Sequence, residues 1–276
     1  MPKVLSPLIP TLAAVRRTLA GSADELCPRV IEMELAAARQ AGWEIDAPHN
    51  YCWRCGATMA PAGITSRGCA FCVNQPIAWD RIVRLGPYRP TLGRWIIAMK
   101  FRRAWAWAPW FGAELARAAA VAPASAPTPA PADRTIVCPV PMHFWRRLGR
   151  GYNQAQLMAG AFAAQRGWPV VHLLRRRRYG RPQTLLPISS RAANVRRAFA
   201  AHPVDLHGCH VWLVDDVRTT GATLRACTRL LRRAGAQSVS VAVAAVADPL
   251  GADFTILHIP RLTTPVRLAI GLRGIP

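Results

Sequence analysis

The sequence predicts an α/β protein: a parallel sheet flanked by helices, with a small cysteine-rich module in front of it. Three observations support this prediction. After residue 134, short apolar runs alternate with stretches of helical periodicity, one apolar run is followed by two acids and a threonine-glycine turn, and two Cys-x2-Cys pairs stand upstream. Alternating strands and helices are typical of a parallel sheet with crossover helices.

The expected elements divide the chain into four parts. Residues 1–46 are an N-terminal helical extension, 47–80 the cysteine-rich module, 81–250 the α/β domain, and 251–276 a C-terminal extension. A Pro/Ala linker at about 121–133 interrupts the domain, and its composition cannot bury apolar surface. We therefore expect it to be an exposed connection.

Periodicity places the individual elements. In the extension, helical spacing at Val30, Met33, Leu35 and Ala38 indicates one or two short helices. The α/β domain is expected to have strands at 81–88, 135–140, 169–174, 211–216 and 238–246. Its expected helices lie at 92–101, 105–120, 153–166 and 223–234.

Composition and charge limit the class of protein. Apolar stretches are broken well before the ~18 residues that a membrane helix needs, and the N-terminus lacks the residue order of a secretion signal. We expect a cytoplasmic protein without membrane insertion. The net charge of +22 attracts phosphate-rich partners, either a small phosphorylated ligand or a nucleic acid. Arginines that merely solvate the surface are the alternative explanation of this charge.

Four cysteines have the spacing of a metal site. Cys52 and Cys55 form one Cys-x2-Cys pair, and Cys69 and Cys72 form the second. Two such pairs are typical of a tetrahedral Zn–S4 centre, which predicts a zinc ribbon with one structural zinc ion. Reduced buried thiols, two disulfides or an iron–sulfur centre are the alternatives.

A second motif indicates a phosphate site. The apolar run Val211–Val214 is suited to a buried strand, and Asp215 and Asp216 follow it. A turn then leads into a helix; its residues are Thr219, Thr220, Gly221, Ala222 and Thr223. Glycine and a helix N-terminus admit an anion, hydroxyls can donate to phosphate oxygens, and carboxylates can accept from sugar hydroxyls. The segment therefore predicts a site for a ribose 5-phosphate group.

This segment resembles the 5-phosphoribosyl-1-pyrophosphate (PRPP) motif of type I phosphoribosyltransferases. The resemblance implies that Asp215 and Asp216 hold the ribose hydroxyls and that the turn holds the 5-phosphate, with Mg²⁺ on the pyrophosphate. The enzymes for 6-oxopurines carry an acid where Thr219 stands. Threonine cannot exchange a proton near neutral pH, so any transfer to a base needs another residue for the proton.

The chain more widely resembles the ComF family of phosphoribosyltransferase-like proteins, which includes competence-associated and gluconate-utilisation-associated members. The similarity runs through the RGYNQ segment at 150–154, the Q…R…N pattern of Gln183, Arg191 and Asn194, and the PRPP motif. It implies a type I phosphoribosyltransferase fold preceded by a zinc ribbon. Further ligand-binding residues are expected at Arg147, Arg150, Gly151, Asn153, Gln154, Arg191 and Asn194.

A different function is suggested by a basic and aromatic stretch. Lys100, Arg102 and Arg103 precede Trp105, Trp107 and Trp110, a mixture that could stack single-stranded bases. Packing of these rings in the core is the simpler interpretation. The alternative to a transferase is therefore a factor for DNA uptake that contacts single-stranded DNA and uses the transferase site as a sensor or scaffold.

Overall fold

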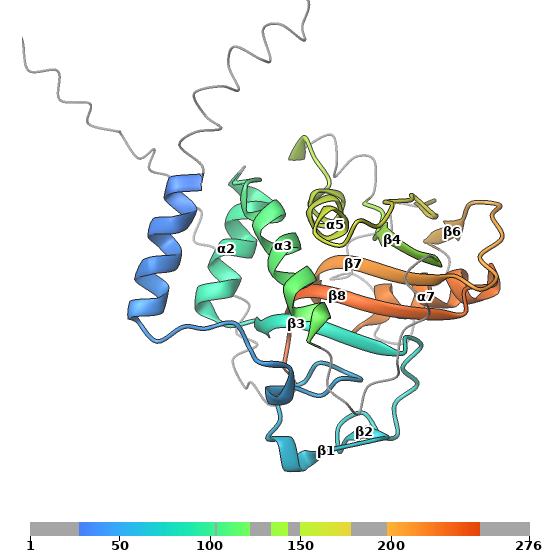
Figure 1. The fold of residues 1–276 in the computed structure, drawn as a ribbon, viewed down its shortest axis with the longest axis horizontal. Coiled ribbons are helices and arrows are strands. Elements are labelled where there is room, and N and C mark those ends of the chain that lie inside the picture. The colour runs from blue at the N-terminus through green and yellow to red at the C-terminus, as the bar shows by residue number, and fades with distance from the viewer. Residues whose placement is uncertain (1–27, 103, 122–133, 143–149, 178–197, 249–276) are drawn as a thin grey trace, which may run out of the picture.

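The computed structural model describes residues 28–102, 104–121, 134–142, 150–177 and 198–248. Its centre is a sheet of four parallel strands in the order β3-β8-β7-β4 (Figure 1). The strands are β3 (Arg81–Pro87), β4 (Thr135–Pro139), β7 (His210–Arg218) and β8 (Ser238–Val246). The predicted α/β class is confirmed.

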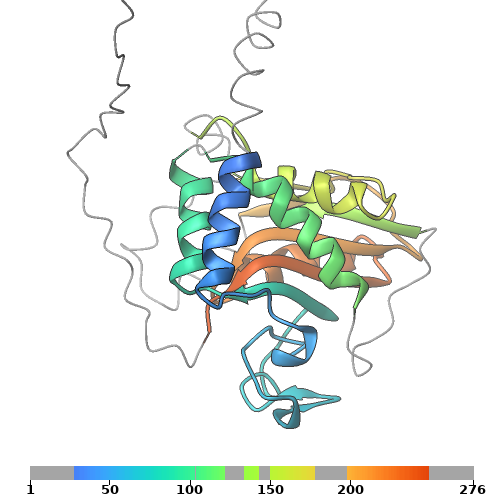
Figure 2. The ribbon, with the colours of Figure 1, turned by 60° about the vertical axis from the view of Figure 1, so that its left-hand side comes forward.

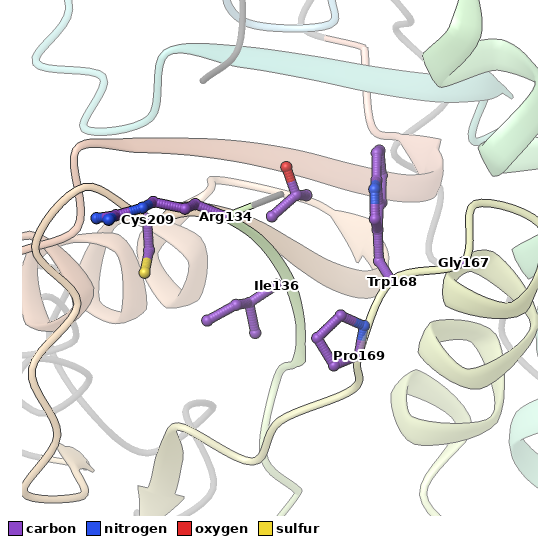
Figure 3. Close-up of a pocket in the computed structure, with 7 residues that line it drawn as sticks. Arg134, Ile136, Gly167, Trp168, Pro169 and Cys209 are labelled. Carbon is purple, nitrogen blue, oxygen red and sulfur yellow. The ribbon is translucent and has the colours of Figure 1, made fainter. Parts of the chain in front are cut away.

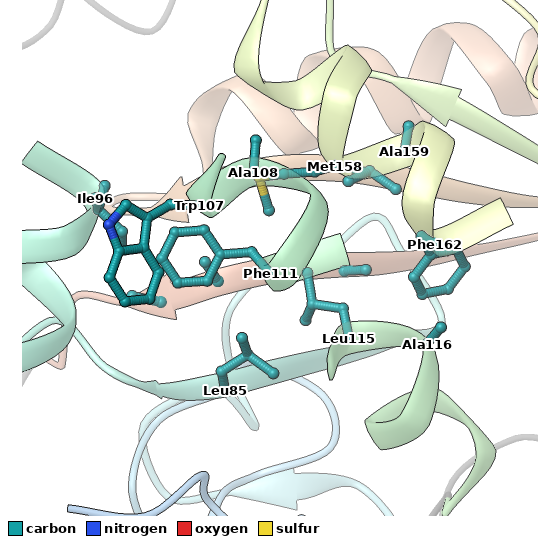
Figure 4. Packing of buried hydrophobic residues seen from close by; sticks show 14 of the residues in the cluster. Leu85, Ile96, Trp107, Ala108, Phe111, Leu115, Ala116, Met158, Ala159 and Phe162 are labelled. Atoms are coloured by element: carbon teal, nitrogen blue, oxygen red, sulfur yellow. The ribbon is translucent and has the colours of Figure 1, made fainter. Parts of the chain in front are cut away.

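Helices cover both faces of the sheet. One face carries α2 (Pro90–Phe101), α3 (Trp107–Ala120) and α5 (Gln154–Ala164), which share one apolar core with the sheet. In Figure 4, Trp107 and Phe111 of α3 and Phe162 of α5 lie in this core. The opposite face carries α7 (Ala222–Arg233) over a second core. Apolar strands buried on both faces are what a parallel sheet requires.

The N-terminal helix covers residues 28–40 and lies beside α2 (Figure 2). Its buried face is Ile31, Leu35 and Ala38, with the spacing of one helical stripe. Val30 and Met33 are instead 53% and 72% exposed. The helix was predicted, but two of the four residues taken as its apolar pattern point away from the core.

The strand expected at 81–88 forms as β3, whereas the strand expected at 169–174 does not form. In β3, Arg81 and Arg84 are buried, because Arg84 pairs with Asp46 at 2.5 Å and Arg81 lies over the Trp212 ring at 4.8 Å. The expected strand at 169–174 is wrong. Only Val170 makes a bridge to Val137, and the chain then forms a short antiparallel pair, β5 (Leu174–Arg176) with β6 (Phe199–Ala201).

The cysteine-rich module has little regular structure. It contains two short 3-10 helices, η1 (Pro48–Asn50) and η2 (Pro61–Gly63), and the two-stranded pair β1 (Ile64–Thr65) and β2 (Gly68–Cys69). The module lies against β3, where Ile82 N–H donates to the Trp53 carbonyl at 2.8 Å. The Pro/Ala linker and the C-terminal extension fall outside the described residues. Within the described ranges, no helix has both the length and the apolar character needed to cross a membrane.

Candidate functional site

The two aspartates lie where one strand of the sheet stops. β4 ends at Pro139, which pairs with Val214, whereas β7 continues beside β8 as far as Arg218. Asp215 and Asp216 therefore lie inside β7, which agrees with the strand expected at 211–216 and extends two residues beyond it. They remain at the carboxyl edge of the sheet, where ligands of open parallel sheets bind.

Asp216 lies at the centre of a polar network. Asp216 is only 6% exposed, and one of its carboxylate oxygens lies 2.7 Å from Lys100 Nζ. The other oxygen accepts from Gln154 Nε2 at 2.5 Å, and Arg150 Nη1 donates to Gln154 Oε1 at 2.7 Å. The fold thus brings the RGYNQ segment to the pair of aspartates at 215 and 216, here called the diacid. Gln154 and Asp216 are 62 residues apart in the sequence.

Asp215 has a different environment from its neighbour. Consecutive strand residues point to opposite faces of the sheet, so Asp215 lies on the α7 face with Cys227. Burial, followed by the neighbouring Asp216 charge, raises the pKa of Asp215 to about 7. Near neutral pH this carboxyl group can both hold and release a proton.

The predicted phosphate turn leads into α7 as expected. Gly221 is the N-cap residue of the helix with φ +72°, in the left-handed region that favours glycine. Thr219 and Thr220 are exposed, and the Thr220 carbonyl accepts from Arg225 Nη1 at 2.8 Å. The first N–H groups of α7 have no partner within the helix, and Ala222 N–H donates to Thr220 Oγ1 at 3.4 Å. A helix end of this kind is suited to binding an anion.

The other predicted ligand residues separate into three groups. Gly151, with φ +86°, is exposed at the start of α5. Asn153 is buried and caps α5, because its Oδ1 accepts from Ala155 N at 3.2 Å. This hydrogen bond gives Asn153 a structural role as the N-cap residue of α5. Arg147, Arg191 and Asn194 lie outside the described residues.

Lys100 is the site residue that sequence reasoning missed. It stands in the last turn of α2, and the sequence grouped it with Arg102 and Arg103 as part of a basic surface. The only local indication of a role in the site was that this lysine follows apolar residues in a helix that packs on the sheet. Its partner Asp216 is remote in sequence and could not be chosen from that signal.

The tryptophans of the basic stretch do not form one open face. Trp107 is 4% exposed and stacks on Trp95 with ring centroids 4.5 Å apart. Trp110 is partly buried and contacts both rings edge-on. Trp105 is 38% exposed. Core packing is the main use of Trp107 and Trp110.

The four cysteines come together as a metal site would require. Their sulfur atoms all lie within 4.8 Å of one another and all four residues are buried. The Cys52–Cys72, Cys55–Cys69 and Cys69–Cys72 sulfur distances are 3.7, 3.6 and 3.9 Å. Zn–S bonds of about 2.3 Å in a tetrahedron give edges of about 3.8 Å, so the cluster fits zinc.

The same distances argue against the disulfide alternative. A disulfide needs sulfur atoms about 2 Å apart, and the cysteines are free thiols. Burial and the nearby Cys52 charge raise the pKa of Cys72 to about 11, so this thiol keeps its proton near neutral pH unless a cation is bound beside it. Within the described ranges, no other group of cysteine, histidine and acidic residues has this arrangement.

A separate hollow lies at the opposite edge of the sheet. Its volume is about 480 Å³, and its lining includes Arg134, Trp168, Pro169 and Cys209 (Figure 3). These residues surround the start of β4, at the amino end of the sheet, so the hollow is remote from the diacid. Cys138 and Cys227 are buried in the core, whereas Cys209 is only half-buried.

Comparison with known proteins agrees with this geometry. Residues 153–253 match the model of the phosphoribosyl transferase domain. The parallel sheet, the diacid and the helix N-terminus therefore belong to a phosphoribosyltransferase-like protein.

Relatives over most of the chain define the family more closely. Competence protein F of Haemophilus influenzae is 31% identical over 196 residues, covering 69% of this chain and 82% of the relative. DNA utilization protein YhgH of Salmonella typhi is 33% identical over 194 residues, covering 70% and 82%. The chain belongs to the family of competence protein F.

A solved structure is also similar. Glutamine PRPP amidotransferase from B. subtilis, complexed with ADP and GMP, is 23% identical, with 51% of this chain and 26% of that chain covered. The TM-score is 0.34, too low to add to what the sheet and the relatives show.

Proposed function

We propose that this protein binds a phosphorylated pentose, PRPP or a nucleotide 5-phosphate, together with Mg²⁺, at the carboxyl end of β7. One observation supports this most strongly. The buried strand β7 carries Asp215 and Asp216, and a turn after it leads to Gly221, which has a left-handed backbone conformation and caps the N-terminus of α7. A segment that only capped the N-terminus of a helix would need one polar side chain and no pair of acids before it. The arrangement has acceptors for a sugar and donors for a phosphate side by side.

Each part of the ligand has residues suited to it. Asp215 and Asp216 accept from the ribose hydroxyls, and Thr219–Thr223 with the helix N-terminus donate to the 5-phosphate. Arg150 and Gly151 are proposed to face a pyrophosphate, and the family resemblance adds Arg147, Arg191 and Asn194, which lie outside the described residues. Gln154 and Lys100 orient the Asp216 carboxylate. Mg²⁺ would neutralise charge on the ligand oxygens, with most of its coordination from ligand and water.

The reaction that such a site supports is transfer of the phosphoribosyl group to an acceptor. Thr219 provides no proton acceptor, in contrast to the acid of the 6-oxopurine enzymes. Among the described residues of the site, Asp215 has a pKa near 7, so it is the group able to manage an acceptor's proton. The acceptor remains to be found by screening pyrophosphate release from PRPP against bases, amines and sugars.

Calorimetric titration of PRPP and Mg²⁺ tests the binding site. We expect Asp216→Asn to weaken binding at least about tenfold, because a hydrogen bond to a charged group contributes about 1.5–3 kcal/mol. Asp205→Asn is the matched control, since Asp205 is an exposed acid that pairs with His207 just before the amino end of β7, opposite to the proposed site. Equal affinities of wild type, Asp216→Asn and Asp205→Asn would discard the site.

The second candidate function is contact with single-stranded DNA. Two observations favour it. The net charge is +22, and one of the relatives is named DNA utilization protein YhgH. With Trp107 and Trp110 in the core, the contact would rely on phosphates more than on base stacking. We then expect affinity for an oligonucleotide to fall steeply with salt, because phosphate contacts release counterions. A slope near zero would remove this candidate.

A further inference from the structure

A tryptophan connects the cysteine cluster to the predicted phosphate turn. Trp79 is 3% exposed, and its Nε1–H donates to the carbonyl of Arg54 at 2.8 Å. Arg54 stands between Cys52 and Cys55, so this carbonyl belongs to the first cysteine pair. The far edge of the same indole meets Gly221, because a Cβ there would lie 3.0 Å from Trp79 Cη2. One rigid side chain thus spans from the metal site to the N-cap of α7.

Arg54 also ties the two cysteine pairs together. Its guanidinium donates to the carbonyl of Cys72 at 2.5 Å and to that of Gln75 at 3.3 Å. The position of the Arg54 carbonyl that holds Trp79 therefore depends on both pairs. A metal ion that fixes four sulfur atoms in a tetrahedron would fix this carbonyl as well.

Arg218 makes a second, electrostatic link. It is the last residue of β7, immediately before Thr219, and is 8% exposed. Its Nε lies 3.4 Å from the Cβ position of Gly221. Burial lowers the pKa of Arg218, while the charges of Cys55 and Cys72 act against that lowering. Four thiolates around a divalent ion keep a net negative charge, which this guanidinium would offset.

The module is also joined to the end of β8. Thr58 N–H donates to both carboxylate oxygens of Asp248 at 3.2 Å, and a Cβ at Gly56 would lie 2.9 Å from Val246 Cγ2. Ala247 N–H in turn donates to the Arg218 carbonyl at 2.8 Å. The cysteine-rich module therefore packs on the same sheet edge that carries the phosphate turn.

We propose that Trp79 is a positioning residue that couples metal binding at the four cysteines to phosphate binding at Thr219–Thr223. The metal is then more than a fold stabiliser, because it holds Gly221 and the start of α7 in the geometry that receives the 5-phosphate. This coupling rests on the proposed function of the turn. Thermodynamic coupling is reciprocal, so the phosphate ligand must strengthen metal binding by the same factor.

The experiment uses the full chain and ribose 5-phosphate as the probe. Its affinity is measured by calorimetry in zinc-loaded protein and in protein freed of metal by a chelator under reducing conditions. We expect the loaded form to bind at least about fivefold more tightly, the lower end of typical coupling. Zinc affinity, measured by competition with a chromophoric chelator, should rise by the same factor when ribose 5-phosphate is saturating.

Two tryptophan variants separate coupling from general loss of stability. Trp79→Phe removes both the donor to Arg54 and the ring edge at Gly221, so the two affinities should become independent while zinc still binds. Trp53→Phe is the matched control, because the Trp53 indole donates to Thr65 within the same module at 3.1 Å. It should keep the full coupling. If the metal-free chain unfolds, zinc affinity with and without the probe, together with the loaded variants, still measures the coupling.

The outcomes distinguish the two proposals. Absence of ribose 5-phosphate binding by the loaded wild type overturns the proposed function of the turn, and the coupling with it. Binding with equal affinity in loaded and metal-free wild type, or equal coupling in Trp79→Phe and Trp53→Phe, overturns the coupling alone.

Discussion

Asp215 and Asp216 are neighbours on one strand and yet have different chemistry. Asp216 is held by Lys100 and Gln154, whereas Asp215 points to the opposite face of the sheet. Burial and the Asp216 charge favour the protonated form of Asp215 and raise its pKa to about 7. The ordinary pKa of an aspartate is 3.8, so Asp215 titrates well above the usual range.

The raised pKa of Asp215 predicts how stability depends on pH. Between about pH 4 and pH 7 the folded protein binds a proton at Asp215 that the unfolded chain has released. Stability therefore falls as pH rises through this window, by up to about 1.4 kcal/mol per pH unit, and this contribution levels off above it. Asp215→Asn should lose this slope, and urea unfolding of both proteins at pH 5, 6 and 7 measures the difference. Parallel curves for the two proteins would contradict the prediction.

Helices α3 and α5 each contain a glycine, and only the glycine of α3 lies in the contact between them. A Cβ at Gly112 of α3 would lie 2.2 Å from the Met158 carbonyl of α5, so the two backbones approach where the side chain is missing. Gly160 of α5 is exposed and has nothing within 4 Å of its Cβ position. The pair of helices covers the strand that carries the diacid, since α5 packs on β7.

These two glycines form a matched pair of variants. Gly112→Ala should destabilise the fold by about 1–3 kcal/mol or more, because backbone atoms have to move apart. Gly160→Ala should stabilise it by about 0.5–1 kcal/mol, since alanine loses less entropy in a helix. Denaturant unfolding of both variants measures these changes, and a loss of stability in Gly160→Ala would contradict the prediction for the exposed glycine.

At the scale of the whole molecule, the described residues form a three-layer α/β/α domain with the cysteine-rich module packed at the carboxyl edge of its sheet. The core of the module is small: the four cysteines, Ala57, and the partly buried Met59, Phe71 and Ile77. A segment with so small a core generally needs a metal or disulfides to stay folded. Because it packs on β3 and the end of β8, its folding bears on the sheet edge where the diacid lies.

Metal content is the test at this scale. We expect one zinc ion per chain by elemental analysis, and its removal by a chelator should lower the midpoint of thermal unfolding by about 5–10 °C, a loss of a few kcal/mol. Cys55→Ser should bind less than one equivalent. Cys209→Ser, at a half-buried cysteine outside the cluster, should keep the full amount. Equal zinc in both variants would mean that the four sulfur atoms are not the ligands.

The sequence by itself determined the features that short segments encode. The apolar run before Asp215 predicted a parallel strand, Gly221 predicted a turn into a helix, and the two Cys-x2-Cys pairs predicted four sulfur atoms in one place. Periodicity and residue type are local, so a pattern of a few residues carries them. The strand at 169–174 failed because its apolar residues satisfy a strand pattern without obtaining a full strand partner.

Only the tertiary structure decided which distant residues meet. Lys100 and Gln154 come to Asp216 from different helices, Trp79 comes to Gly221 from the module, and Ile31 faces the core in place of Val30. Each of these choices depends on how helices and module pack on the sheet. Packing is a property of surfaces that fit together across the chain, and no local pattern of residues contains it.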